Sequence, residues 1–346
     1  MHEERAAETP AETPAETPAA AALAEAAAAL RERLAALDRA LRTRIVGQAE
    51  VVEQVVDALL AGGHVLLEGV PGLGKTLLVK TLAQATGLGF GRVQFTPDLM
   101  PGDITGSQVL DPQGGGLRFD PGPIFTNLLL ADEINRATPR TQSALLEAMQ
   151  ERAVTVAGVS HPLPRPFFVL ATQNPLEQEG TYPLPEAQLD RFFYKVLVPF
   201  PTEEELAEIA LRTTGGEEPP VPRVLEAGDL LAAAELVRQV VVAPPVLQYA
   251  VRLVAATHPD RSPVEAVRRY ARYGASPRGL QALVLGAKVR ALRAGRWGVS
   301  FGDIEAVALP ALRHRVAVNF EARAEGLGPE DLVRAVLAAV RPPERA

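Results

Sequence analysis

The feature that most constrains this chain is the octapeptide Gly-Val-Pro-Gly-Leu-Gly-Lys-Thr at residues 69–76. It has the P-loop pattern, in which two glycines with four residues between them are followed by Lys and Thr. The apolar run Val65-Leu66-Leu67 before it predicts a buried parallel strand, and residues 77–85 after it predict a helix. In that context glycines let backbone N–H groups close around phosphate oxygens, and the helix N-terminus adds partial positive charge. The octapeptide therefore predicts a nucleoside triphosphate site rather than a fortuitous glycine-rich turn.

The last two residues of the pattern have separate expected tasks. Lys75 is expected to reach the β- and γ-phosphates, and the Thr76 hydroxyl is expected to ligate magnesium. Apolar residues ahead of a P-loop strand often pack against the nucleotide base, with the alternative that they simply belong to the core. The predicted nucleotide contacts are Gly69, Pro71, Gly72, Leu73, Gly74, Lys75, Thr76, Leu77, Val46 and Gly47.

Two neighbouring acids follow a second predicted strand. Residues 124–132 contain an apolar run and end in Asp132-Glu133, well downstream of the P-loop. Beside a P-loop, Asp132 is predicted to hold the magnesium shell and Glu133 to polarise an attacking water. The alternative is an ordinary strand end with two solvated acids.

A polar amide follows a third predicted strand, residues 167–172. Asn174 comes just after this strand, and the carboxyl end of an inner parallel strand lies at the ligand edge of an open α/β sheet. We therefore predict that Asn174 orients the lytic water. Formation of a turn before Pro175 is a second role that Asn174 can have at the same time.

Two arginines are further candidates. Arg191 stands just before the apolar segment 194–198, either as a structural ion-pair partner or as a group offered to a neighbouring copy's γ-phosphate. Arg278 opens a predicted helix over 278–294. A positive charge at a helix N-terminus is electrostatically unfavourable, which indicates a ligand requirement.

Composition excludes several other classes of site. The 346 residues suffice for one large α/β domain and a smaller one. The 35 basic and 42 acidic residues give a net charge of −7, so no overall field attracts nucleic acid or an anionic membrane. The absence of cysteine excludes disulfides, thiolate nucleophiles and cysteine-based zinc sites. The longest apolar stretch, residues 19–30, is too short to span a bilayer, and Met1-His2-Glu3-Glu4 is unlike a basic signal leader, so a cytoplasmic location is expected.

The chain divides into three predicted parts. Residues 1–18 contain three copies of Ala-Glu-Thr-Pro and are expected to be a disordered tail, with a docking peptide as the alternative. Residues 19–200 hold a lead-in helix and the α/β core, and from residue 201 to 346 the pattern predicts helices only. Within the core, the Gly/Pro-rich segment 97–123 is long enough to be functional or mobile.

Taken in order, these motifs resemble those of the AAA+ ATPases, and within them closely the MoxR family. The resemblance begins at about Ile45, covers most of the chain, and rests on segments 69–76, 94–101, 131–136, 171–175, 184–192 and 275–279. It implies an α/β fold: a P-loop NTPase (AAA+) with a parallel sheet sandwiched by helices, followed by an all-α lid domain.

The resemblance also implies a role for each candidate. Lys75 and Thr76 belong to Walker A, Asp132 and Glu133 to Walker B, Asn174 is sensor 1, Arg191 is the arginine finger directed at the adjacent copy, and Arg278 is sensor 2 from the lid. Segment 97–119 matches the helix-2 insert, and segment 154–164 matches the pre-sensor hairpin. Since lid and core would both touch nucleotide, we expect hydrolysis to change the angle between them.

The activity implied is hydrolysis of ATP with Mg²⁺ by a homo-oligomer, a hexamer by resemblance. Proteins of this type act as chaperones that remodel a client protein, in metal insertion or complex maturation, often with von Willebrand factor A-domain partners. One alternative is a DNA-processing AAA+ motor, which the acidic balance and the lack of a helix-turn-helix or stacking aromatics disfavour. A small-molecule kinase is disfavoured by Glu133 together with Asn174, and a nucleotide-gated scaffold that hydrolyses little is disfavoured by Glu133.

Overall fold

The computed structural model of the chain describes residues 18–111, 116–174, 180–216 and 219–343. The Ala-Glu-Thr-Pro segment, expected to be a disordered tail, lies outside these residues except for Pro18. At the centre is a five-stranded sheet in the order β2-β5-β8-β1-β9, with every neighbouring pair parallel. Its strands are β1 (Val65–Glu68), β2 (Phe90–Gln94), β5 (Leu128–Asp132), β8 (Phe168–Gln173) and β9 (Tyr194–Leu197).

Helices cover both faces of this sheet, as predicted, because the strand side chains alternate between two apolar clusters. Leu67 and Leu130 belong to the cluster that contains α1, α2 and α3, whereas Leu66 and Leu129 belong to the cluster that contains α5. Both faces are buried, which is why the strands are apolar throughout. The helices are α1 (Pro18–Arg42), α2 (Ala49–Leu60), α3 (Lys75–Thr86) and α5 (Pro139–Glu151), with the short η1 (Ile134–Arg136) and α6 (Glu186–Leu189) between strands.

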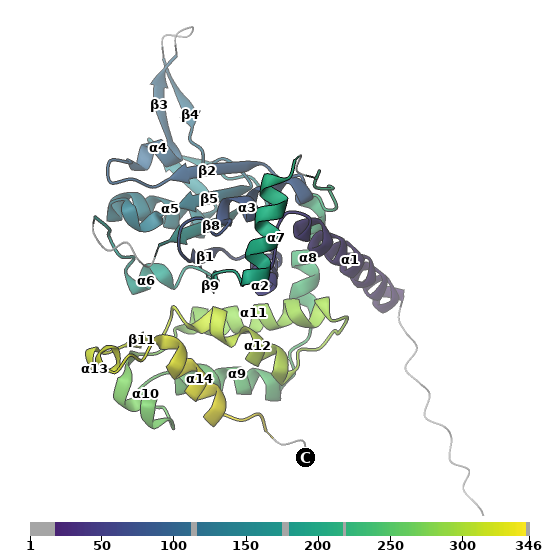
Figure 1. Cartoon of the computed structure of the whole chain (residues 1–346), viewed down its shortest axis with the longest axis vertical. Helices are drawn as coiled ribbons and strands as arrows, with labels where there is room; N and C mark the ends of the chain where they lie inside the picture. The colour runs from purple at the N-terminus through teal and green to yellow at the C-terminus, as the bar shows by residue number, and fades with distance from the viewer. Residues whose placement is uncertain (1–17, 112–115, 175–179, 217–218, 344–346) are drawn as a thin grey trace, which may run out of the picture.

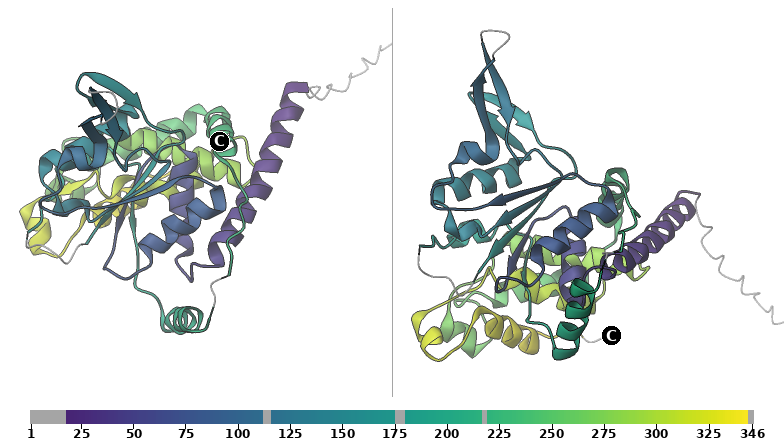
Figure 2. Two further views of the ribbon diagram at one scale, coloured as in Figure 1. Left: turned by 90° about the horizontal axis from the view of Figure 1, so that it is seen from above. Right: turned by 45° about the horizontal axis from the view of Figure 1, so that its top comes forward.

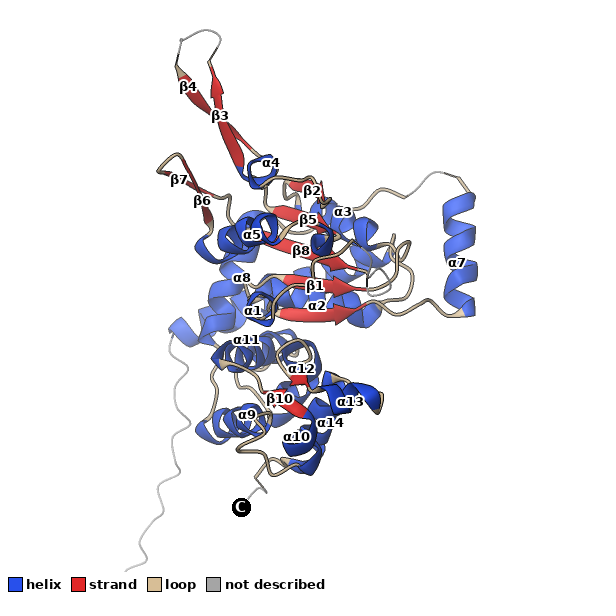
Figure 3. Cartoon of the chain, turned by 90° about the vertical axis from the view of Figure 1, so that its left-hand side faces the viewer, coloured by secondary structure: helices blue, strands red, loops and turns tan. Residues whose placement is uncertain are grey.

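Two hairpins project from one end of the core (Figures 1 and 3). The Gly/Pro-rich segment forms α4 (Pro101–Thr105) and the antiparallel pair β3 (Gly106–Leu110) and β4 (Leu117–Pro121). The second hairpin is β6 (Ala153–Val156) with β7 (Val159–Pro162). The Phe119 ring stacks on the His161 ring with centroids 3.9 Å apart, so the two hairpins are in contact.

The rest of the chain is helical apart from one short pair of strands. The helices are α7 (Glu203–Thr214), α8 (Ala227–Gln239), α9 (Pro244–Ala256), α10 (Glu265–Tyr270), α11 (Pro277–Arg293), α12 (Phe301–Leu312), α13 (Phe320–Ala324) and α14 (Pro329–Ala339). The strands are β10 (Ala271–Tyr273) and β11 (Ala317–Val318), which are too short to leave a periodic signal in the sequence. The division of the chain at residues 200 and 201 stays a prediction.

Helices α9 to α14 lie on the side of the sheet opposite the hairpins, next to β9, whereas α7 and α8 lie beside the core (Figures 1 and 2). Arg293 on α11 donates to Asp57 on α2 at 2.6 Å and to Asp38 on α1 at 3.0 Å. Arg315, which follows α12, donates to the Asp190 carboxylate at 2.8 Å and to the Phe192 carbonyl at 2.6 Å. One apolar cluster runs from the sheet into α9, α11, α12 and α14. The helical part therefore contacts the core of its own chain through ion pairs and a shared apolar cluster.

Within the described residues, none of the helices combines the length and the apolar character that crossing a bilayer requires.

Candidate nucleotide-binding site

The P-loop connects β1 to α3 with the predicted strand–turn–helix geometry. Gly72 and Gly74 have φ angles of 85° and 75°, a region that glycine adopts without strain, and α3 begins at Lys75. Lys75 Nζ donates to the Gly69 carbonyl. Burial lowers the pKa of the Lys75 ammonium, and the acids Asp132 and Glu133 oppose that shift.

A polar cavity of about 440 Å³, here called the P-loop pocket, collects most of the predicted catalytic groups. Its lining residues are Pro71, Gly72, Gly74, Lys75, Thr76, Leu77, Arg92, Gln94, Asp132, Glu133 and Asn174. Because β1, β5 and β8 are parallel neighbours, their carboxyl ends meet at one edge of the sheet. That edge brings together residues that are about a hundred positions apart in the sequence.

Asp132 is held by two donors. Thr172 Oγ1 donates to one carboxylate oxygen at 2.7 Å, and Arg92 Nη2 donates to the other at 2.7 Å. Thr172 also accepts the backbone N–H of Glu133 at 2.8 Å, which ties β8 to the end of β5. The carboxylate therefore has a fixed orientation and a neutralising partner.

Glu133 is held through one of its two carboxylate oxygens. Oε2 accepts from Gln94 Nε2 at 2.7 Å and from Arg136 Nη1 at 3.1 Å. Glu133 has a φ of 56°, a conformation that is costly for a residue with a side chain and that is often found at functional sites. Within the described residues Oε1 has no hydrogen-bond partner, so it can accept a proton.

Sequence reasoning missed Arg92, and it used Gln94 and Thr172 only as parts of family motifs. All three act on Asp132 or Glu133. Arg92 and Gln94 lie on β2, which precedes β5 by more than thirty residues in the sequence and pairs with it only in the folded sheet. A charged residue inside the short strand β2 was the one available signal.

Thr76 and Asp132 have suitable chemistry for a magnesium ion. Both offer hard oxygen donors, which Mg²⁺ prefers, and both line the P-loop pocket beside the loop that would hold phosphates. Arg92 pairs with one Asp132 oxygen, so a magnesium ion at this carboxylate would share it with the guanidinium.

An apolar cavity of about 340 Å³ adjoins the P-loop pocket and shares loop residues with it. Its apolar lining comes from Ile45, Val46, Pro71, Leu73, Leu77, Phe200, Pro201, Leu206 and Ile209. α7 forms one wall, a contribution that sequence analysis did not anticipate. Gly47 is adjacent rather than lining, with a φ of 62°, and a side chain there would meet the Glu205 carboxylate. Gln48 donates to the Leu73 carbonyl at 3.0 Å and so ties this wall to the P-loop.

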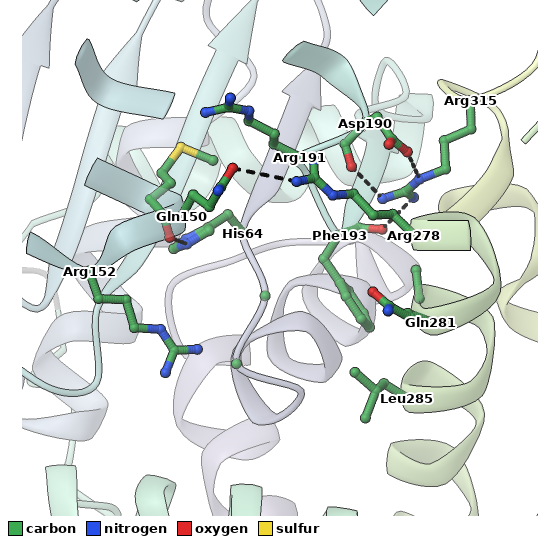
Figure 4. A pocket seen from close by; sticks show the side chains of 14 residues that line it. His64, Gln150, Arg152, Asp190, Arg191, Phe193, Arg278, Gln281, Leu285 and Arg315 are labelled. Carbon is green, nitrogen blue, oxygen red and sulfur yellow. Dashed lines mark hydrogen bonds and ion pairs between the residues drawn. The ribbon is translucent and has the colours of Figure 1, made fainter. Parts of the chain in front are cut away.

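Arg191 and Arg278 line neither of these two cavities. Both line a separate cavity of about 340 Å³ that we call the arginine pocket, together with Arg152, Arg315 and Asp190 (Figure 4). Arg191 Nη1 donates to the Leu146 carbonyl at 2.9 Å, and Arg278 Nη2 donates to Gln150 Oε1 at 3.4 Å. The expected site residues thus form two groups, one at the P-loop and one at the arginine pocket. Arg278, expected as the lid residue that would share nucleotide with its own core, lies with Arg191 rather than with Lys75.

Comparison with known proteins gives the following matches. Residues 64–194 match the family described as "ATPase family associated with various cellular activities (AAA)", and residues 264–336 match the family described as "AAA lid domain". The chain is 45% identical to Chaperone MoxR1 of Mycobacterium tuberculosis over 87% of this chain and 80% of that protein. It is 32% identical to Protein MoxR of Methylorubrum extorquens over 90% of this chain and 96% of that one. A crystal structure of a candidate ATPase from Cytophaga hutchinsonii superposes with a TM-score of 0.88 at 39% identity, covering 94% of this chain and 99% of the other.

Proposed function

The chain belongs to the MoxR family of AAA+ ATPases, and on that premise we propose that it hydrolyses ATP with Mg²⁺ in the P-loop pocket of one copy, aided by arginines of the next. The observation that carries the proposal is the convergence of Lys75, Thr76, Asp132, Glu133 and Asn174 on one cavity. The adjoining apolar cavity has the chemistry to take the adenine base.

In this proposal the protein positions the reactants and stabilises charge. Lys75 binds the β- and γ-phosphates, while Thr76 and Asp132 hold magnesium, which when bound supplies positive charge at the phosphate oxygens. Glu133 Oε1 accepts a proton from the attacking water, and Asn174 orients that water. A bond forms between the water oxygen and the γ-phosphorus, the bond to the β-phosphate oxygen breaks, and ADP leaves.

The arginine pocket is assigned to the neighbouring copy. Arg191 and Arg278 line a cavity separate from the P-loop pocket, so a head-to-tail contact is the arrangement that joins the two. Repetition of that contact around a closed ring accounts for the proposed hexamer. Arg293 and Arg315 connect the helical part to its own core, and the angle proposed to change during turnover is the one between neighbouring copies.

Mixing two inactive variants tests this assignment. Lys75→Ala removes a phosphate ligand but keeps the arginine pocket, and Arg191→Ala does the reverse. Each alone should lose most activity, since an arginine supplied by a neighbour contributes about 10³–10⁵ in rate. In a 1:1 mixture, about a quarter of the sites in a random head-to-tail ring pair an intact P-loop with an intact neighbouring arginine. The rate of phosphate release by the mixture should therefore return to about a quarter of that of the unmodified chain. Full activity of Arg191→Ala alone, or no recovery on mixing, would contradict the proposal.

We further propose that the two hairpins contact a client protein or a von Willebrand factor A-domain partner in the cytoplasm. The hairpins project from the core and expose Leu110, Leu117 and Val159. A Glu133→Gln chain, which should hold ATP without cleaving it, is expected to retain such a partner through affinity purification. Adding Leu110→Ser and Leu117→Ser to the Glu133→Gln chain should abolish retention of the partner. The same two serine substitutions in a chain that keeps Glu133 should leave its ATPase activity unchanged. Equal retention with and without the serine substitutions would exclude this hairpin as the contact.

A further inference from the structure

The arginine pocket carries a charge imbalance that Arg191 and Arg278 do not account for alone. Four arginines line it, and Asp190 is its one acidic lining residue. Asp190 is already paired with Arg315, whose guanidinium also donates to backbone carbonyls. Arg191 and Arg278 each have a neutral acceptor. Within the described residues, the side chain of Arg152 has neither a hydrogen bond nor an ion pair.

Arg152 and Arg278 are exposed and Arg191 is half-buried, so three guanidinium groups without a carboxylate partner give this cavity a positive potential that attracts an anion. A polar or charged arrangement that stability alone does not explain is characteristic of functional sites. Arginine side chains pair with phosphate oxygens in a bidentate manner, so a polyphosphate is the ligand that such a cluster fits best.

The backbone around Arg152 is fixed. Arg152 is the C-cap residue that follows α5, with a φ of 54°, in the left-handed region that disfavours residues with a side chain. Its N–H donates to the Ala148 carbonyl at 2.9 Å, and its own carbonyl accepts from Leu163 at 3.0 Å. His64 Nε2 bonds the Met149 carbonyl at 3.2 Å from the other side. Hydrogen bonds with Ala148, Leu163 and His64 therefore hold the backbone of this turn. Figure 4 shows the Arg152 side chain on the α5 side of the pocket.

We propose that Arg152 is a third guanidinium that binds the triphosphate held by the P-loop of the neighbouring copy, together with Arg191 and Arg278. This inference rests on the proposed function, because it needs the arginine pocket to face a neighbour's nucleotide. Arg152 follows α5, Arg191 follows α6, and Arg278 lies in the first turn of α11. The triphosphate would then be contacted from three separate elements of the second copy.

A purely local explanation of Arg152 makes a different prediction. A cation at the end of α5 interacts favourably with the helix dipole, and lysine serves that purpose as well as arginine. Bidentate phosphate binding requires arginine. Arg152→Lys should therefore keep the thermal unfolding midpoint of the chain yet lose activity, whereas the local explanation predicts that it keeps both.

The decisive experiment repeats the mixing test with Arg152→Ala. Alone, this variant should lose at least about tenfold in ATP turnover, as expected for removal of one charge-stabilising donor. Mixed 1:1 with Lys75→Ala, which supplies an intact Arg152 beside a disabled P-loop, it should recover activity. Arg140→Ala, an exposed arginine at the other end of α5, is the matched control and should match the unmodified chain.

The outcomes separate this inference from the function on which it rests. If Arg191→Ala recovers on mixing but Arg152→Ala does not, Arg152 is not a contact to the neighbour and the proposed function still holds. If neither recovers, the arrangement between copies is wrong. Inorganic triphosphate titrated into dilute Lys75→Ala protein tests a free polyanion as the alternative source of the ligand. Binding there that Arg152→Ala abolishes would overturn the assignment to a neighbour's nucleotide.

Discussion

At the scale of single residues, His64 shows how the core supports the arginine pocket. Its ring is buried between β1, β8 and the end of α5. Nδ1 accepts the Val169 N–H at 3.1 Å, so Nε2 carries the proton and donates to the Met149 carbonyl. Burial lowers the pKa of His64 to about 4. The neutral ring therefore joins the sheet to the turn that holds Gln150 and Arg152.

His64 should make the chain less stable in acid. Its folded pKa lies below the ordinary value of 6.5, so the unfolded chain takes up this proton first. Stability from this source is complete above pH 6.5 and is lost as the pH falls toward 4, by up to about 3 kcal/mol. Burial raises the pKa of Asp57 to about 6, so Asp57 has the opposite effect on stability as the pH falls. This effect is the same in the unmodified chain and in the His64→Gln variant. Urea unfolding from pH 7 to pH 4 should show a smaller loss for His64→Gln, and equal losses would contradict this role.

At the scale of elements, the seat of α11 on the sheet depends on a glycine. A Cβ at Gly286 would lie 1.9 Å from the Tyr194 hydroxyl oxygen on β9. Both residues are buried, and the Tyr194 hydroxyl has no hydrogen-bond partner within the described residues. The missing side chain, rather than the flexibility of glycine, is what lets the helix approach the strand.

Gly286→Ala should therefore destabilise the chain despite the better helix propensity of alanine. Overpacking in a buried contact costs about 1–3 kcal/mol. Gly228→Ala on α8 is the matched control, because a Cβ there meets nothing within 4 Å. It should be neutral or slightly stabilising. Chemical denaturation compares the two, and a Gly286→Ala chain as stable as the control would mean that α11 can shift freely.

At the scale of the whole molecule, core and helical part share one apolar cluster and a buried ion pair. Asp57 is 3% exposed and its partner Arg293 is 17% exposed, and they connect α2 to α11. Burial disfavours the charged form of Asp57, and Arg293 offsets that effect. A chain connected in this way should unfold as one unit.

Calorimetry of the full chain should accordingly show one unfolding transition. Arg293→Ala leaves a buried carboxylate without its partner, which should cost about 3–5 kcal/mol and lower that transition as a whole. Arg334→Ala breaks an exposed pair with Glu330 and should cost under about 1 kcal/mol. A separate transition of the helical part at lower temperature, in the unmodified chain or in the Arg293→Ala variant, would show that the two parts fold independently.

The sequence by itself determined the local chemistry of this protein. The P-loop pattern, the apolar runs and the acids or amide that follow them depend on nearest neighbours in the chain, so they predict strands, helices and a phosphate-binding turn. The parallel-sheet α/β class and the family followed from the order of these motifs. The roles of the individual site residues stay predictions.

Tertiary structure decided which of these residues share a cavity. Arg92 reaches Asp132 because β2 pairs with β5, and α7 walls the apolar cavity although it follows the P-loop by more than a hundred residues. Arg278 lies with Arg191 and Arg152 because α11 packs against α2 and β9. Contacts between distant segments depend on how whole elements pack, and no local pattern records that packing.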